Sequence, residues 1–144
     1  MIRRLTPAWR LRATVAALGL PPLVHVMPLD RIVRWMNRGP SGSPTAADPV
    51  DDRAVAEWVD RVLGRLPPPW RRTCLKRALV LQYLVRSAGR RTELCIGVRR
   101  DALNALTAHA WLVRDGVPYL EAGADHVASY RLLTTFPSAS EVDR

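Results

Sequence analysis

The chain has 144 residues, 48% of them hydrophobic, and its 22 basic and 13 acidic residues give a net charge of +9. This length supplies one compact core but not two, so we expect one folded domain with an N-terminal extension. Two cysteines are too few for the disulfide framework of a small secreted protein, which argues against that class and favours the reducing cytoplasm.

Positive charge is concentrated in the first 38 residues, which contain seven arginines and one aspartate. Such a segment suits nucleic acid, an anionic membrane or an acidic peptide. The sequence contains neither zinc-finger spacings nor aromatic-basic RNA-binding motifs, so we expect no nucleic acid partner.

The N-terminal segment combines a basic start with an apolar run, "ATVAALGLPPLV" at residues 13–24. A signal peptide has the same order of segments, but no small-x-small cleavage site follows here. Pro21, Pro22 and Pro28 interrupt the run, which is also too short for a transmembrane helix. We therefore predict separate helical pieces, the last of them amphipathic over residues 29–36, and no membrane contact.

A cluster of Gly, Ser and Pro, "NRGPSGSPTAADP" at residues 37–49, is predicted to be a flexible connection. We place the domain boundary at its end. Residues 1–49 form a basic helical extension and linker, and residues 50–144 form the domain proper.

Two helices are predicted at the start of the domain. The first covers residues 51–63, where Val55 and Val59 lie one turn apart, and a proline run ends it. The second is "TCLKRALVLQYLVRSAG" at residues 73–89, with Gly89 where a left-handed C-terminal residue is expected. This second helix is apolar on almost every side, so we expect it to be buried at the centre of the domain.

Cys74 occupies the first turn of the second helix, directly after Thr73 as a predicted N-cap. Unpaired backbone N–H groups and the positive end of the helix dipole favour a thiolate there, and Arg71, Arg72 and Lys76 add positive potential. The same N–H groups could donate to the oxyanion that forms when the sulfur attacks a carbonyl. The alternative is that Cys74 is a small buried residue, the commoner role of a free cysteine.

A strand is predicted over residues 92–98, where Leu94 and Ile96 alternate with Cys95. Because nothing near Cys95 in the sequence activates it, we predict a structural role for it. The two cysteines and the histidines show none of the short ligand spacings of metal sites, so we expect no metal.

A hairpin is predicted at residues 108–121, "AHAWLVRDGVPYLE", with His109 and Trp111 on one face of its first strand. A three-residue Arg-Asp-Gly loop would set His109 directly against Glu121, with Cβ atoms about 4.5–5.5 Å apart. A two-residue Asp-Gly loop would instead pair Glu121 with Ala110 and turn its side chain to the opposite face.

With the three-residue loop, Glu121 would orient His109, and His109 would take the proton of Cys74 for attack on an acyl carbon. In the alternative, His109 is a half-buried strand residue and Glu121 a solvated charge. Trp111 shares the face of His109 and is predicted to shield the imidazole or shape a substrate groove. The alternative for Trp111 is a plain core aromatic. Trp70, four residues before Cys74, could donate its indole N–H to the oxyanion.

The stretches "CLKRALVLQYLVRSAGRRTELCIGV" and "AHAWLVRDGVPYLE" resemble the transglutaminase-like cysteine peptidases, and most closely the free-standing leader peptidases of lasso peptide biosynthesis. The resemblance covers about residues 50–136. It implies an α+β fold with a papain/transglutaminase-like core. A central helix bearing the cysteine packs on a small antiparallel sheet bearing the histidine and the acid, after a helical N-terminal extension.

The Cys-His-acid triad of this family corresponds to Cys74, His109 and Glu121 in this chain. The acid is usually an aspartate in the family, so Asp115 and Asp125 are alternative third members. The resemblance implies no cofactor.

The resemblance also implies hydrolysis of one peptide bond, which frees the core of a ribosomally made precursor from its leader in the cytoplasm. The expected partners are the precursor peptide, a separate leader-recognition protein and an ATP-dependent macrolactam cyclase. Arg31 and Arg34 are candidates for docking the recognition protein, or else form a solvated helix face. The alternative functions are a transglutaminase-like acyl transferase or amidase with another substrate, and a catalytically silent binding module.

Overall fold

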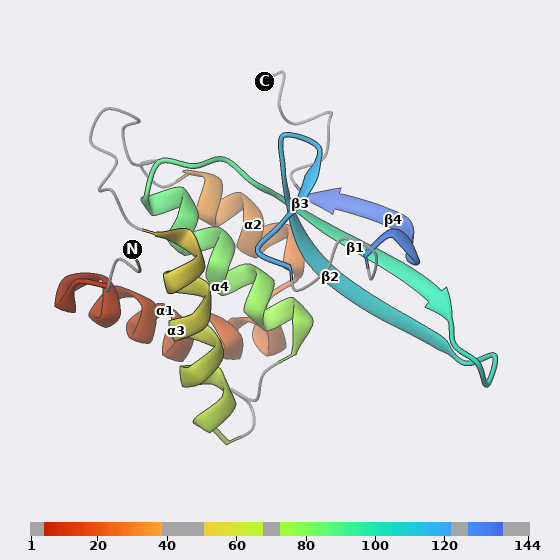
Figure 1. Ribbon diagram of the computed structural model, residues 1–144, viewed down its shortest axis with the longest axis horizontal. Coiled ribbons are helices and arrows are strands. Elements are labelled where there is room, and N and C mark those ends of the chain that lie inside the picture. The colour runs from red at the N-terminus through yellow and green to blue at the C-terminus, as the bar shows by residue number, and fades with distance from the viewer. Residues whose placement is uncertain (1–4, 39–50, 68–72, 122–126, 137–144) are drawn as a thin grey trace.

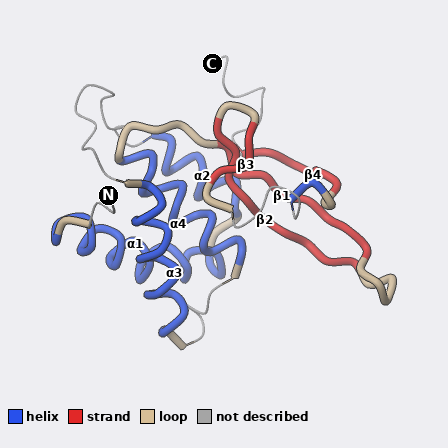
Figure 2. Tube along the Cα trace, viewed as in Figure 1, coloured by secondary structure: helices blue, strands red, loops and turns tan. Residues whose placement is uncertain are grey.

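The computed structural model of the chain describes residues 5–38, 51–67, 73–121 and 127–136. Within these ranges a layer of helices lies against an antiparallel sheet of order β3-β2-β1-β4, which confirms the predicted α+β class (Figures 1 and 2). The described elements are α1 (Pro7–Val26), α2 (Leu29–Arg38), α3 (Asp52–Arg65), α4 (Cys74–Ser87), β1 (Glu93–Arg100), β2 (Leu106–Arg114), β3 (Val117–Tyr119) and β4 (Arg131–Phe136).

The helix that begins at Cys74, α4, contacts α1 and α3 as well as β1 and β2. Its N-terminus is capped as predicted, because the hydroxyl oxygen of Thr73 accepts from the backbone N–H of Lys76 at 3.3 Å. Gly89 follows its C-terminus with a φ of 89°, the left-handed conformation expected there. Both ends of α4 are therefore fixed, and Cys74 lies in its first turn.

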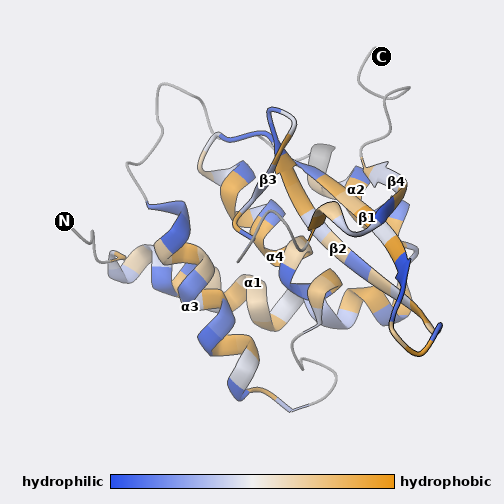
Figure 3. Ribbon diagram, turned by 45° about the vertical axis from the view of Figure 1, so that its right-hand side comes forward, coloured by the Kyte–Doolittle hydropathy of each residue, from blue (hydrophilic) through white to orange (hydrophobic). Residues whose placement is uncertain are grey.

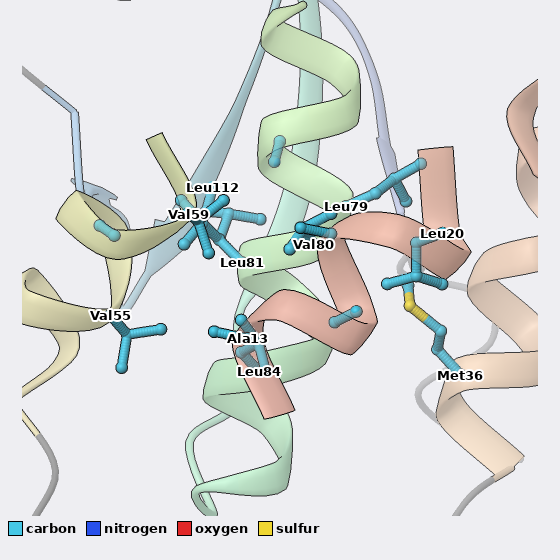
Figure 4. Close-up of a cluster of buried hydrophobic side chains, with 14 of the residues drawn as sticks. Ala13, Leu20, Met36, Val55, Val59, Leu79, Val80, Leu81, Leu84 and Leu112 are labelled. Carbon is cyan, nitrogen blue, oxygen red and sulfur yellow. The ribbon is translucent and has the colours of Figure 1, made fainter. Parts of the chain in front are cut away.

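The hydrophobic core surrounds α4. Leu81 and Leu84 of α4, Val59 of α3 and Leu112 of β2 are each at most 1% exposed and belong to one cluster, to which α1 and α2 also contribute (Figure 4). Burying a side chain of this size stabilises the fold by about 1.5–3 kcal/mol. Because the cluster spans α4 and β2, it holds the helix of Cys74 against the strand of His109.

The first helix differs from the prediction, because α1 continues through Pro21 and Pro22 instead of breaking into separate pieces. Each proline lacks an N–H and so removes one bond to the carbonyl four residues earlier. Leu20 and Pro21 are buried in the helical layer, and this packing holds α1 together across the prolines. None of the described helices is both long and apolar enough to cross a membrane.

The second helix, α2, is amphipathic as predicted, since Ile32 and Val33 are buried whereas Arg31 and Arg34 are exposed. The flexible connection predicted at residues 37–49 lies almost entirely outside the described residues. The domain boundary therefore stays a prediction, although helices on both sides of it share one core.

The strand predicted around Cys95 is present as β1, and its pairing with β2 defines two faces. Cys95 lies opposite Trp111 and Gly97 opposite His109, so these four residues share one face of the sheet, on which Cys95 and Trp111 belong to a small hydrophobic cluster separate from the main core. Leu94 points to the other face and joins the core. A Cβ atom on Gly97 would lie 2.8 Å from a ring carbon of Trp111. Glycine is thus needed for the indole to cross β1.

Candidate active site

Cys74 is half-buried and lines a cavity of about 460 Å³ between α3, α4 and the end of the β2–β3 hairpin. Polar side chains of α3 line this cavity, whereas most of the apolar residues of α3 are buried in the core. Hydrophilic and hydrophobic segments alternate along this helix (Figure 3). The polar and reactive side chains of the cavity are Arg53, Glu57 and Asp60 from α3, Cys74 and Arg77 from α4, and His109 and Glu121 from the hairpin. The three residues predicted to act together thus line one cavity.

The hairpin register differs from the predicted one. Arg114 pairs with Val117, so the loop has two residues, Asp115 and Gly116, with φ of 53° and 79°. Such a pair of left-handed residues is typical of the tight turn that matches the twist of the strands. The predicted three-residue loop is therefore wrong, and in this register a continued β3 would set Glu121 against Ala110, on the face away from His109.

Glu121 nevertheless reaches His109, because β3 ends at Tyr119 and Leu120 has a φ of 60°. A residue in the left-handed region interrupts the alternation of side chains along the strand. The chain turns at Leu120, and Oε2 of Glu121 lies 3.3 Å from Nε2 of His109. The predicted contact is present, but a turn after β3 makes it and not a pair of opposed strand residues.

Arg77, one turn after Cys74 on α4, holds this turn in place. Its Nη2 donates to the carbonyl oxygen of Leu120 at 2.9 Å, and its Nε donates to Oδ1 of Asp60 at 2.8 Å. Its Nη1 is 3.8 Å from Oε1 of Glu121. The side chains of His109, Glu121 and Arg77 are only 12–16% exposed, so the attraction between Arg77 and Glu121 is only weakly screened by water.

Aromatic rings cover the imidazole on the sheet side. The ring of Trp111 is nearly parallel to that of His109, with centroids 5.8 Å apart and an angle of 17°, and Trp111 is 5% exposed. The ring of Tyr130 lies 5.2 Å from that of His109, and the guanidinium of Arg99 lies over Tyr130 at 4.7 Å. Trp111 therefore covers one side of the His109 ring, and its predicted role at the site stays a prediction.

A comparison with protein families matches residues 10–135 to the family described as the transglutaminase-like superfamily. This chain belongs to the transglutaminase-like superfamily. Its members are usually cysteine peptidases or transglutaminases, which in general terms fits a cavity lined by a helix-borne cysteine and a strand-borne histidine. No curated protein and no solved structure matched the chain in the corresponding comparisons.

Several other residues that the sequence analysis considered do not line the cavity of this superfamily member. Cys95 is 5% exposed, its Sγ is 3.8 Å from the hydroxyl of Thr135, and burial raises the pKa of its thiol, which fits a structural role. The side chain of Asp115 is 93% exposed in the turn, so Glu121 is the acid that faces His109. Three residues and one alternative acid fall outside the described part of the chain, namely Trp70, Arg71, Arg72 and Asp125.

The sequence pattern did not reveal Arg77 and Tyr130, nor the cavity residues of α3, namely Arg53, Glu57 and Asp60. Arg77 lies three residues after Cys74, hence on the same side of α4, but its partners come from two distant segments, α3 and the turn after β3. Tyr130 is distant from His109 in the sequence, and only the folded chain brings their rings together.

In the part of the chain that the structure describes, no group of three or more His, Cys, Asp or Glu side chains is arranged to hold a metal ion.

Proposed function

We propose that the protein is a cysteine peptidase in which Cys74 is the nucleophile, His109 the general base and Glu121 the residue that orients the imidazole. The observation that carries the proposal is the 3.3 Å contact between Nε2 of His109 and Oε2 of Glu121 in a cavity that Cys74 also lines. A proton on Nε2 donated to Glu121 leaves the lone pair of Nδ1 for the thiol proton.

The proposed reaction uses these side chains in turn. The thiolate of Cys74 attacks the peptide carbonyl carbon, a C–S bond forms, and the negative charge moves to the carbonyl oxygen. Backbone N–H groups at the start of α4 are suited to donate hydrogen bonds to that oxyanion. The C–N bond breaks as the imidazolium of His109 gives its proton to the leaving amine. Water, deprotonated by His109, hydrolyses the thioester and releases the carboxylate product with a free thiol.

The proposed substrate is the precursor of a lasso peptide, and the proposed cleavage removes its leader in the cytoplasm. This substrate rests on the resemblance of the segments around Cys74 and His109 to free-standing leader peptidases. A separate leader-recognition protein would deliver the precursor, and an ATP-dependent macrolactam cyclase would close the ring on the new N-terminus. Arg34 is paired with Asp30 within α2, so Arg31 is the stronger candidate of the two predicted docking arginines.

The test is cleavage of a candidate precursor encoded beside the gene, together with the neighbouring recognition protein, followed by mass spectrometry. We expect one cleavage by the unaltered protein and none by Cys74→Ala. His109→Ala should lower kcat by about 10²–10⁴-fold. Cys95→Ala is the matched control and should retain cleavage. Unimpaired cleavage by Cys74→Ala would exclude the mechanism.

Membership of the superfamily is also consistent with an acyl transferase or amidase, which is the second candidate function. Both enzymes pass through the same thioester on Cys74, so the acceptor distinguishes them. With a small primary amine in excess, a transferase gives an amide product, whereas a peptidase gives mainly the carboxylate. A silent binding module, the third alternative, predicts that Cys74→Ala leaves the biological function intact.

A further inference from the structure

Arg77 connects three parts of the molecule that surround the proposed site, namely α4, α3 and the turn after β3. It starts from α4, one turn after Cys74, and its side chain is 15% exposed. One nitrogen donates to Asp60 on α3 and another to the carbonyl of Leu120, the left-handed residue after β3. The guanidinium is therefore held by two hydrogen bonds independently of Glu121.

The third contact of Arg77 engages the carboxylate oxygen that does not face His109. Oε2 of Glu121 is 3.3 Å from His109, whereas Oε1 is 3.8 Å from Nη1 of Arg77. Each oxygen of this carboxylate thus has a different cationic or hydrogen-bonding neighbour, which fixes both the position and the rotation of the group. A lysine has a single nitrogen and could not make the three contacts together.

We infer that Arg77 is a positioning residue that acts through Glu121, by holding the Leu120 turn and the carboxylate so that Oε2 faces His109. The inference rests on the proposed function, because it concerns the orientation of the proposed general base. Arg77 itself touches neither the thiol proton nor the substrate in this account.

The test uses the alkylation rate of Cys74 by iodoacetamide at about pH 6, where an ordinary thiol is almost fully protonated. The rate is followed by peptide mass in the unaltered protein, Arg77→Met, Glu121→Gln and the double variant. We expect each single variant to slow Cys74 about tenfold and the double variant to be no slower than either. Arg65→Met, on the exposed last turn of α3, is the control and should react like the unaltered protein.

Two results would overturn the inference: an unchanged rate in Arg77→Met, or effects of the two substitutions that multiply in the double variant. Multiplying effects would mean that the charge of Arg77 acts on the thiol without Glu121. Arg77→Lys separates the same cases, because it keeps the charge and should remain slow if geometry matters.

The proposed function fails in a different way, namely if His109→Ala reacts as fast as the unaltered protein. If Arg77→Met does not fold, as judged by circular dichroism, Asp60→Asn replaces it, because this change removes only one anchor of the guanidinium. Asp60→Asn should slow Cys74 in the unaltered background and have no effect in the Glu121→Gln background. Any further slowing in that background would contradict the inference.

Discussion

At the scale of single residues, the two cysteines have opposite surroundings. Cys95 is buried on the outer face of the sheet beside Thr135, and burial raises the pKa of its thiol. Cys74 is half-buried at a helix N-terminus and lines the cavity. We predict that iodoacetamide at neutral pH modifies Cys74 several times faster than Cys95, and that the two become alike in denaturant. Equal rates in the native protein, measured by peptide mass, would contradict this.

Substitution of Gly97 should displace Trp111, whose ring stacks on His109. A Cβ atom there would lie 2.8 Å from the ring of Trp111 and 2.9 Å from the carbonyl oxygen of Arg131. Gly97→Ala should lower the free energy of unfolding in urea by about 1–3 kcal/mol, as overpacking does. Gly64→Ala, in α3 with no atom within 4 Å of the new Cβ, is the control and should be neutral or stabilising. Gly97→Ala with unchanged stability would show that the indole can move aside.

At the scale of elements, the site depends on the first turn of α4 and on the turn after β3. The first turn is closed by the hydroxyl of Thr73, which accepts from Lys76 and so fixes the backbone around Cys74. Thr73→Ala should lower the free energy of unfolding by about 1 kcal/mol, whereas Thr73→Ser keeps the acceptor and should cost much less. Equal losses for the two variants in urea unfolding would mean that the cap is not the source of the stability.

The solvent-exposed side of α1 carries a row of apolar side chains. Leu11, Val15 and Leu18 recur at helical spacing and are 44–66% exposed. An exposed apolar stripe of this kind is typical of an interaction surface, and we propose it as the place where the recognition protein would dock.

Replacement of Leu11 and Val15 by serine should leave the unfolding midpoint nearly unchanged, because neither side chain is buried. We expect precursor cleavage in the presence of the recognition protein to fall at least severalfold. Leu103→Ser is the control, since Leu103 is 89% exposed at the tip between β1 and β2. Cleavage that stays unchanged in the double variant, or falls equally in the control, would argue against docking on α1.

Local sequence patterns encode some features of this fold and leave others open. The bounds of α4 follow from Thr73 and Gly89 and from its apolar periodicity, so they could be predicted closely. The hairpin register turns on a choice between two and three loop residues, which the sequence leaves open. The contact of Glu121 with His109 needs a left-handed leucine, which intrinsic preferences disfavour.

Long-range contacts explain the remaining differences. The partners of Arg77 lie 17 and 43 residues away in the sequence, and only the packing of α3, α4 and the hairpin brings them together. The continuity of α1 across Pro21 likewise depends on its burial in the helical layer. Neither feature has a local signature, so neither could be predicted from the sequence alone.

We have proposed that His109, oriented by Glu121, activates Cys74. The rate of Cys74 alkylation in the unaltered protein, His109→Ala and Glu121→Gln tests this proposal. The assay needs no substrate. At about pH 6 we expect the unaltered protein to react fastest, His109→Ala slowest and Glu121→Gln between them, because each change removes support for the thiolate. Equal rates for all three proteins, with native circular dichroism, would contradict the claim.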